Sequence, residues 1–159
     1  MQFDRRMMLG GAGALAVGFL LFGRSGPADA RFAVTRTPAE WRRILGPQRY
    51  PILREGATEP PYSSPLNKEH RRGTFACAGC GLPLFASATK FDSGTGWPSF
   101  WRALPRATVD RADRTFGMVR TEVLCARCGG HLGHVFDDGP RPTGLRYCMN
   151  GLALKFRLA

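Results

Sequence analysis

The chain has 159 residues, 43% of them hydrophobic, which is enough for one globular domain with its own core. Its 20 glycines and 12 prolines favour turns and β-structure over a helical bundle. The formal charge of +11 would suit nucleic-acid binding, but the arginines and lysines are scattered and never run longer than two. A phosphate-binding surface needs a cluster or stripe of such residues, so composition argues against a nucleic-acid site and leaves an acidic partner protein open.

The first thirty residues have the pattern of a secretory targeting segment. Arg5-Arg6 precedes an apolar run from Met7 to Phe22, and Ala28-Asp29-Ala30 offers a small-x-small cleavage site. The segment resembles a twin-arginine export signal, although Asp4 stands where Ser or Thr is usual. We expect export to the periplasm by the twin-arginine machinery, with cleavage after residue 30. An uncleaved leader that anchors the protein in the membrane is the alternative, although the run is short for a span of about 20 residues.

The residues after the leader predict one helix and then irregular structure. Thr37-Pro38-Ala39-Glu40 combines a capping box with proline at the first helical position. The helix should continue through Trp41, a core residue, and end at Gly46-Pro47. Because further prolines follow, residues 47–72 are expected to be irregular, with at most one more helical turn.

From Thr74 onward the sequence has the pattern of strands and turns, with short alternating segments separated by glycines. No helical pattern intervenes between these segments. We therefore predict a mainly β fold of two small antiparallel sheets, preceded by short N-terminal helices. The expected strands are 74–77, 82–85, 108–112, 116–124, 131–136, 145–149 and 152–157.

Four of the five cysteines form two nearly identical C-x-x-C-G turns. Two such turns supply four thiolates in a tetrahedral set, which is the closed form of a structural zinc site. We expect one structural Zn²⁺ per chain, while iron on the same sulfurs and two disulfides are the alternatives. A closed site has no open coordination position, so any chemistry must involve the fifth cysteine. The expected metal ligands are Cys77, Cys80, Cys125 and Cys128.

Two further segments carry side chains suited to a site. The loop Asp92–Trp101 concentrates aromatic residues among glycine and proline, which suits either a binding surface or a plug over the core. His131 and His134 would face opposite sides of a regular strand, so both can reach one site only if Gly133 permits a β-bulge. Surface histidines are the alternative.

The segment Gly144–Asn150 alternates with the two-residue period of a strand. This period places Arg146, Cys148 and Asn150 on one face, while Tyr147 and Met149 point into a core. A nearby cation favours the thiolate form of a cysteine, so Cys148 can act as a nucleophile. A buried structural cysteine is the alternative.

From about residue 37 to residue 158, the sequence resembles the methionine-R-sulfoxide reductase B family. The leader, residues 1–30, lies outside this resemblance, so residues 31–159 form the expected reductase domain. Many separate motifs occur in the order that the family has. These motifs are Gly56–Pro61, the two C-x-x-C-G turns, Lys90–Phe100, Gly117–Val123, His131–Phe136 and Gly139–Asn150.

The resemblance implies a β-rich fold with a structural zinc and reduction of the R epimer of methionine sulfoxide in oxidised proteins or peptides. The Cys148 thiolate would attack the sulfoxide sulfur and become a sulfenic acid. The departing oxygen needs a proton, and we favour His131 as the acid with His134 next to it. Arg146 and Asn150 would orient substrate or water and favour the thiolate.

The resemblance also assigns a substrate contact and a reductant. Trp97 resembles the family residue that holds the S-methyl group of the substrate, with Phe100 supporting it. Thr95 stands where many relatives carry a second, resolving cysteine. We therefore expect the Cys148 sulfenic acid to be reduced by an outside thiol, either a thioredoxin-like protein or a small molecule. The enzyme is expected to repair oxidative damage as a monomer.

Two functions of other classes remain open. A zinc-knuckle module could use the basic surface to bind nucleic acid or a partner protein, in which case binding would survive loss of Cys148. A thiol–disulfide oxidoreductase could use its C-x-x-C pairs, and a tightly bound zinc would exclude this because it occupies those sulfurs.

Overall fold

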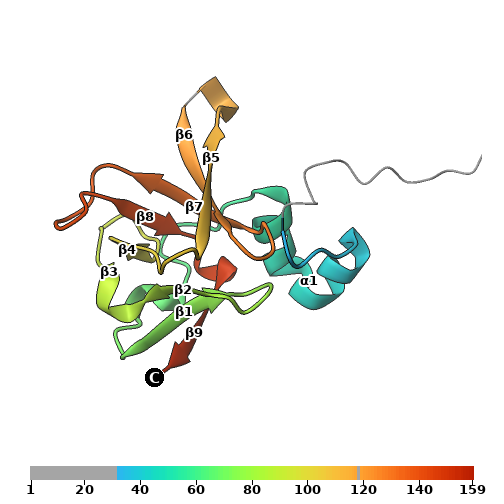
Figure 1. The fold of residues 1–159 in the computed structure, drawn as a ribbon, viewed down its shortest axis with the longest axis horizontal. Helices are drawn as coiled ribbons and strands as arrows, with labels where there is room; N and C mark the ends of the chain where they lie inside the picture. Colours follow the sequence, from blue (N-terminus) through green and yellow to red (C-terminus); the bar gives the residue numbers. More distant parts are fainter. Residues whose placement is uncertain (1–31, 118) are drawn as a thin grey trace, which may run out of the picture.

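A computed structural model describes residues 32–117 and 119–159, so the expected leader, residues 1–30, lies outside the described residues. Helix α1 (Pro38–Glu55) comes first, and strands joined by turns and short 3₁₀ segments follow (Figure 1). In the described part of the chain, no helix combines the length and the apolar character needed to cross a membrane.

The strands form two antiparallel sheets, which confirms the predicted fold class. The smaller sheet has the order β2-β1-β9, with β1 Gly73–Cys77, β2 Pro83–Ala86 and β9 Leu154–Leu158. The larger sheet has the order β3-β4-β8-β7-β6-β5. Its strands are β3 Lys90–Phe91, β4 Ser99–Phe100, β5 Thr108–Asp113, β6 Arg120–Cys125, β7 His131–Phe136 and β8 Arg146–Met149.

Each of the seven predicted segments contains a strand, and the structure has two further strands that the sequence did not predict. Strands β3 and β4 have only two residues each, which is too short to show a period in the sequence. The segment predicted as 116–124 is a strand only from Arg120, because residues 115–117 form a 3₁₀ turn. These differences matter for function, because β4 lies next to the strand that carries Cys148.

Helix α1 consists of two segments, and the first of them ends at Gly46-Pro47 as predicted. Its capping box is present, and the helix breaks at Gly46, where the backbone is not helical (φ 67°, ψ −180°). The prediction that residues 47–72 hold at most one further turn is wrong, since a second helical segment runs from Pro47 to Glu55. Pro47 can begin that segment because the first turn of a helix does not use its backbone N–H groups.

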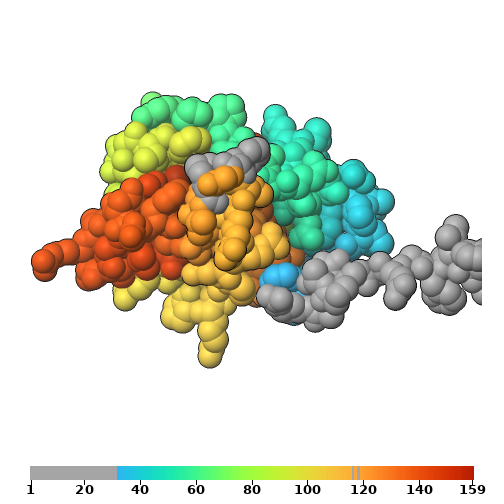
Figure 2. Space-filling model, turned by 90° about the horizontal axis from the view of Figure 1, so that it is seen from above, coloured from blue at the N-terminus to red at the C-terminus, as the bar shows by residue number. Residues whose placement is uncertain are grey.

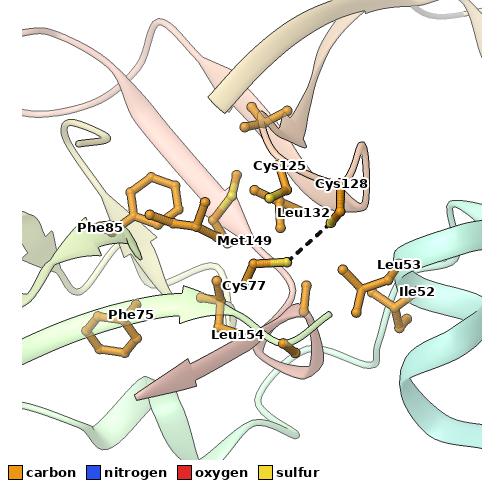
Figure 3. Close-up of a cluster of buried hydrophobic side chains, with 14 of the residues drawn as sticks. Ile52, Leu53, Phe75, Cys77, Phe85, Cys125, Cys128, Leu132, Met149 and Leu154 are labelled. Atoms are coloured by element: carbon orange, nitrogen blue, oxygen red, sulfur yellow. Dashed lines mark hydrogen bonds between the residues drawn. The ribbon is translucent and has the colours of Figure 1, made fainter. Parts of the chain in front are cut away.

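The core lies between the two sheets and is closed at one end by α1. Phe75 and Leu154 come from the smaller sheet, Leu132 and Met149 from the larger one, and Leu53 from α1, all with at most 2% of their surface exposed. Figure 3 shows Cys77 and Cys128 pointing toward each other within this cluster. The metal-ligand candidates are therefore part of the hydrophobic core.

The hairpin of β5 and β6 extends away from the rest of the larger sheet (Figure 1). In the space-filling view it occupies the centre of the face, in gold and orange, between α1 in blue to cyan and the β7–β8 region in orange-red (Figure 2). The hairpin carries Asp113 and Glu122, and both side chains bond to histidines of β7.

Candidate active site

One row of side chains crosses the larger sheet and centres on Cys148. In the strand register, Cys148 of β8 faces Ser99 of β4 on one side and His134 of β7 on the other. The row continues to Glu122 of β6 and Arg111 of β5. Directly opposed residues of antiparallel strands share a face of the sheet. The fold therefore brings a thiol, a hydroxyl, an imidazole, a carboxylate and a guanidinium to one face.

The surroundings of Cys148 do not keep its thiol permanently ionised. Burial raises the pKa of Cys148, and Thr95 and Arg146 oppose this shift without cancelling it. The charge of Arg146 is shared, because its Nε and Nη2 atoms each donate to the Asp138 carboxylate at 2.8 Å. The expected effect of Arg146 on Cys148 has the right direction, but burial outweighs it.

A β-bulge brings the two histidines of β7 together. Val123 of β6 pairs with Gly133 and the next residue pairs with His131, which leaves Leu132 as the extra residue of β7. Gly133 has φ 154°, and a Cβ there would collide with the carbonyl oxygen of Cys148. The ring centroids of His131 and His134 are 5.6 Å apart. The bulge that the sequence required at Gly133 is therefore present.

His131 is held by a buried carboxylate. Its Nδ1 lies 2.7 Å from Oε1 of Glu122, and Arg111 Nε donates to Oε2 of the same carboxylate at 2.7 Å. Burial by itself raises the pKa of Glu122, but the bonds from His131 and Arg111 outweigh it, and the net effect lowers that pKa. The other ring nitrogen, Nε2, is buried and has no hydrogen-bond partner among the described residues. His131 thus has one oriented nitrogen and one available nitrogen.

His134 has a corresponding partner in Asp113. Its Nε2 lies 2.8 Å from Oδ2 of Asp113, which also accepts from Nη2 of Arg120 at 2.7 Å. Hydrogen bonds from Thr115 and His134 hold the pKa of Asp113 well below its usual range. Burial lowers the pKa of His134 and outweighs the effect of Asp113. His134 is therefore a neutral imidazole at pH 7, with its proton held on Nε2 by the carboxylate.

Glu122 and Asp113 are site residues that the sequence pattern did not single out. Glu122 carried a weak signal, since it lies inside a predicted strand directly before the apolar pair Val123-Leu124, whereas soluble proteins rarely bury a glutamate. Asp113 lies at the end of a strand among other charged residues and carried no such signal. Its role depends on strand pairing, which a single sequence does not specify.

The two aromatic residues expected at the substrate site have different environments in the structure. Trp97 is partly exposed, and its Nε1 donates to the carbonyl oxygen of Glu59 at 3.1 Å. Phe100 is fully buried and stacks on Phe85, with ring centroids 4.4 Å apart. It pairs with Tyr147, one residue away from the Ser99–Cys148 pair, and so points to the core face. Phe100 is therefore a core residue, and the expectation that it supports Trp97 in substrate binding stays a prediction.

Asn150 is buried, with both ends of its carboxamide hydrogen-bonded within the protein, and its expected role of orienting substrate or water stays a prediction. Its Oδ1 accepts from the Glu59 N–H at 3.1 Å, and its Nδ2 donates to the Leu132 carbonyl at 3.3 Å. Glu59, which is 3% exposed, accepts from the N–H groups of Gly151 and Leu152. The sequence analysis quoted Glu59 only as part of a motif. In the structure, the Glu59 carboxylate bonds to the residues that follow β8, and its carbonyl oxygen bonds to Trp97, the candidate substrate contact.

The four paired cysteines form a compact group. Their sulfurs all lie within 4.8 Å of one another, with 3.7 Å between Cys77 and Cys128 and 3.5 Å between Cys80 and Cys125. Sulfurs around a tetrahedral Zn²⁺ at about 2.3 Å are about 3.8 Å apart, whereas a disulfide requires about 2.05 Å. The geometry and the thiolate donor set fit a closed metal site, and Cys148 is not a member of this group.

Comparison with known proteins gives concordant matches. A family model, described as the SelR domain, matches residues 45–158. A "Peptide methionine sulfoxide reductase MsrB" of Bradyrhizobium diazoefficiens is 58% identical over 123 residues, covering 77% of this chain and 88% of the relative. Proteins with the same name from Thiobacillus denitrificans and Methanosarcina barkeri are 57% and 48% identical, over 76% and 80% of this chain and 92% and 91% of the relatives.

Proposed function

The chain belongs to the SelR-domain family of methionine-R-sulfoxide reductases B, which makes it an oxidoreductase, and we propose that its reaction proceeds through Cys148. Three observations support this assignment of the nucleophile. Cys148 is outside the metal-ligand group, it lies opposite His134, and it is partly exposed. The position of Cys148 in the row with His134 and Glu122 carries the proposal.

The first step transfers oxygen to the enzyme. The Cys148 thiolate attacks the sulfur of the R-sulfoxide and forms an S–S bond with it. The S–O bond of the substrate breaks, the oxygen passes to the Cys148 sulfur as the S–S bond breaks, and methionine departs to leave a Cys148 sulfenic acid. The substrate sulfur is reduced by two electrons and the cysteine sulfur is oxidised by two. The oxygen requires a proton as its bond to the substrate breaks, and a positioned acid accelerates such a step by about 10²–10⁴-fold.

His131 supplies that proton in our proposal, from Nε2. Support comes from the Glu122 carboxylate, which holds the ring of His131 through Nδ1, and from the absence of a partner for Nε2 among the described residues. His134 is less suited to donate, because its lowered pKa leaves it neutral at pH 7. Its position opposite Cys148 suits it to accept the thiol proton.

Three other predicted residues act on substrate or on its neighbours. Trp97 holds the S-methyl group in our proposal, which is compatible with its partial exposure and its anchored indole nitrogen. Arg146 favours the thiolate and stays oriented through Asp138. Asn150 is a positioning residue that acts through its bonds to Glu59 and Leu132.

Recycling of the enzyme uses an external thiol. An incoming thiol attacks the Cys148 sulfur, water leaves, and a mixed disulfide forms; a second thiol then restores the Cys148 thiol and departs as a disulfide. The absence of cysteine at position 95 supports this order, as does the packing of the other four sulfurs against one another. A thioredoxin-like protein or a small thiol would serve as reductant.

The metal in this proposal is a structural Zn²⁺ bound by the four paired cysteines. In a closed four-sulfur site the ion contributes folding energy and no chemistry. The proposal also places the enzyme in the periplasm as a monomer, exported by the twin-arginine machinery or anchored through an uncleaved leader. Fractionation of cells that express the tagged full chain, with and without replacement of both Arg5 and Arg6 by lysine, tests the location.

The reaction is tested with separated R and S epimers of methionine sulfoxide in a peptide. We expect the purified zinc-loaded protein, with dithiothreitol as reductant, to convert the R epimer alone. The Cys148→Ser variant should have no turnover while it retains zinc and its thermal unfolding midpoint. Equal use of both epimers, or turnover by Cys148→Ser, would contradict the proposal.

A further inference from the structure

Three hydroxyl groups form a continuous chain that ends at the sulfur of Cys148. Ser99 Oγ lies 2.7 Å from Ser93 Oγ, which lies 2.8 Å from Thr95 Oγ1, and that atom lies 3.8 Å from Cys148 Sγ. At the far end, Ser99 Oγ donates to the carbonyl oxygen of Trp97 at 3.1 Å. The chain therefore connects a sulfur atom to a backbone carbonyl through three groups that can each donate and accept.

The loop that carries two of these hydroxyls is held in place by its neighbours. Ser99 itself is fully buried in strand β4. The carbonyl oxygen of Gly96 accepts from the backbone N–H of Tyr62 at 2.7 Å and from Nδ2 of Asn67 at 2.9 Å. The hydroxyl of Tyr62 donates to the carbonyl oxygen of Gly94 at 2.6 Å. Tyr62 makes these bonds with φ 63°, a backbone conformation that bulky residues rarely adopt.

The chain of three hydroxyls has two complete hydrogen-bond arrangements. When Cys148 is a thiol, its S–H donates to Thr95, Thr95 to Ser93, Ser93 to Ser99, and Ser99 to the Trp97 carbonyl. When Cys148 is a thiolate, Thr95 donates to the sulfur, Ser93 to Thr95, and Ser99 to Ser93. Each hydroxyl proton has an acceptor in both arrangements. The change requires only rotation of O–H bonds, with no movement of heavy atoms.

We propose that Thr95, Ser93 and Ser99 are positioning residues whose hydroxyl chain reverses its direction when Cys148 ionises and thereby stabilises the thiolate. The inference rests on the proposed function, in which the Cys148 thiolate is the nucleophile. The hydroxyl chain is not a route for the proton that Cys148 loses, because the hydroxyl chain ends at the carbonyl oxygen of Trp97. The proton lost by Cys148 goes to solvent or to His134.

The charged and titratable groups beside Cys148 lie on strands β7 and β8, not on the loop before β4. Arg146 lies on the same strand and is paired with Asp138, and His134 faces Cys148 from β7. The carboxylate of the loop, Asp92, is exposed and accepts from the backbone of Gly94. On the loop side, the groups that reach toward Cys148 are thus neutral hydroxyls.

Two hydroxyls of the chain lower the pKa of Cys148. Burial raises the pKa of Cys148, and Thr95 is first among the groups that lower it, followed by Arg146 and Ser99. A hydrogen bond to a charged group shifts a pKa by about one to two units. A second hydroxyl that donates to the first strengthens that bond by about 10–30%. Ser93 should therefore act on Cys148 through Thr95, to which it donates when Cys148 is a thiolate.

The test measures the pH midpoint for alkylation of Cys148 by iodoacetamide in the zinc-loaded full chain, by mass spectrometry of the peptide that contains Cys148. Thr95→Val should raise the midpoint by about one to two units. Thr95→Ser, which retains the hydroxyl, should restore it. Ser93→Ala should raise the midpoint by about 0.2–0.5 unit, and should add nothing when combined with Thr95→Val.

The control is Thr89→Val, which removes a buried hydroxyl that donates only to the Ala86 and Arg102 carbonyls. It should leave the midpoint unchanged. A midpoint that Ser93→Ala does not move, or moves equally with and without the Thr95 hydroxyl, would overturn the proposal. Because alkylation does not require turnover, a protein with the expected shifts but no sulfoxide reduction would retain the hydroxyl chain and refute only the proposed reaction.

Discussion

Thr95 lies beside Cys148, so the side chain at position 95 decides which thiol can reach a Cys148 sulfenic acid. Its Oγ1 is 3.8 Å from the Cys148 sulfur, so a cysteine sulfur near that position would have to approach the Cys148 sulfur to about 2.05 Å to form a disulfide. We expect Thr95→Cys to form an intramolecular disulfide with Cys148 after one turnover. Mass spectrometry of unreduced peptides measures this product, and Thr95→Ser is the matched control. A Thr95→Cys protein that accumulates only sulfenic acid would contradict this placement.

Glu122 couples the protonation of the site to stability. Its pKa is lowered in the folded protein, so its contribution is complete above the unfolded value of about 4.3 and is lost as the pH falls below that value. At pH 7, Glu122→Gln should reduce the unfolding free energy by about 1–3 kcal/mol, because it weakens the bonds to His131 and Arg111. Urea denaturation of both proteins at pH 7 and pH 3.5 measures the effect. A difference that stays constant down to pH 3.5 would show that folding does not lower the pKa of Glu122.

At the scale of elements, the bulge in β7 aligns the histidines with Cys148. Gly133→Ala would place a methyl group against the Cys148 carbonyl oxygen at φ 154°, so we expect a loss of about 1–3 kcal/mol in stability. A displacement of about 1 Å at the site can cost about 10²-fold in rate, and kcat/KM for the R epimer should fall by about that factor. Gly46→Ala is the control, because Gly46 has φ 67° with open space around it. It should lose stability but retain kcat/KM, and an equal loss of activity in both variants would refute the role of the bulge.

The β5–β6 hairpin acts as a second element that orients the site. It extends from the sheet (Figure 1), yet its Asp113 and Glu122 side chains reach back to the two histidines of β7. Each carboxylate is bound by an arginine of the same hairpin, Arg120 or Arg111. The projecting hairpin therefore fixes the imidazole protons without contacting Cys148 in the strand register.

At the scale of the molecule, the four metal-ligand candidates connect the two sheets. Cys77 is in β1 and Cys125 in β6, and both are fully buried in the core (Figure 3). We expect one zinc per chain by elemental analysis and cooperative unfolding when a strong chelator removes it, because structural zinc contributes about 10–16 kcal/mol of apparent binding free energy. Circular dichroism during titration with chelator follows this transition. A metal-free protein with an unchanged melting temperature would contradict a structural role.

The sequence specified the parts of the molecule that depend on local patterns. Alternation and glycines located seven strands, the capping box located the start of α1, and cysteine spacing located the metal-ligand group. Because His131 and His134 can reach one site only through a β-bulge, the sequence also indicated where a bulge would lie. Strand pairing was not accessible in this way. The partnership of Asp113 and Glu122 with the histidines, and the burial of Phe100, follow from register between distant segments.

The central claim, that Cys148 alone among the five cysteines changes oxidation state, is tested most directly by a single turnover without reductant. The zinc-loaded protein is mixed with less than one equivalent of R-sulfoxide peptide, and sulfenic acid is trapped with dimedone and located by mass spectrometry. We predict one trapped sulfenic acid on Cys148 for each methionine formed, with zinc retained and no disulfide. Methionine formation accompanied by zinc release, or by a disulfide that includes Cys77, Cys80, Cys125 or Cys128, would contradict the account.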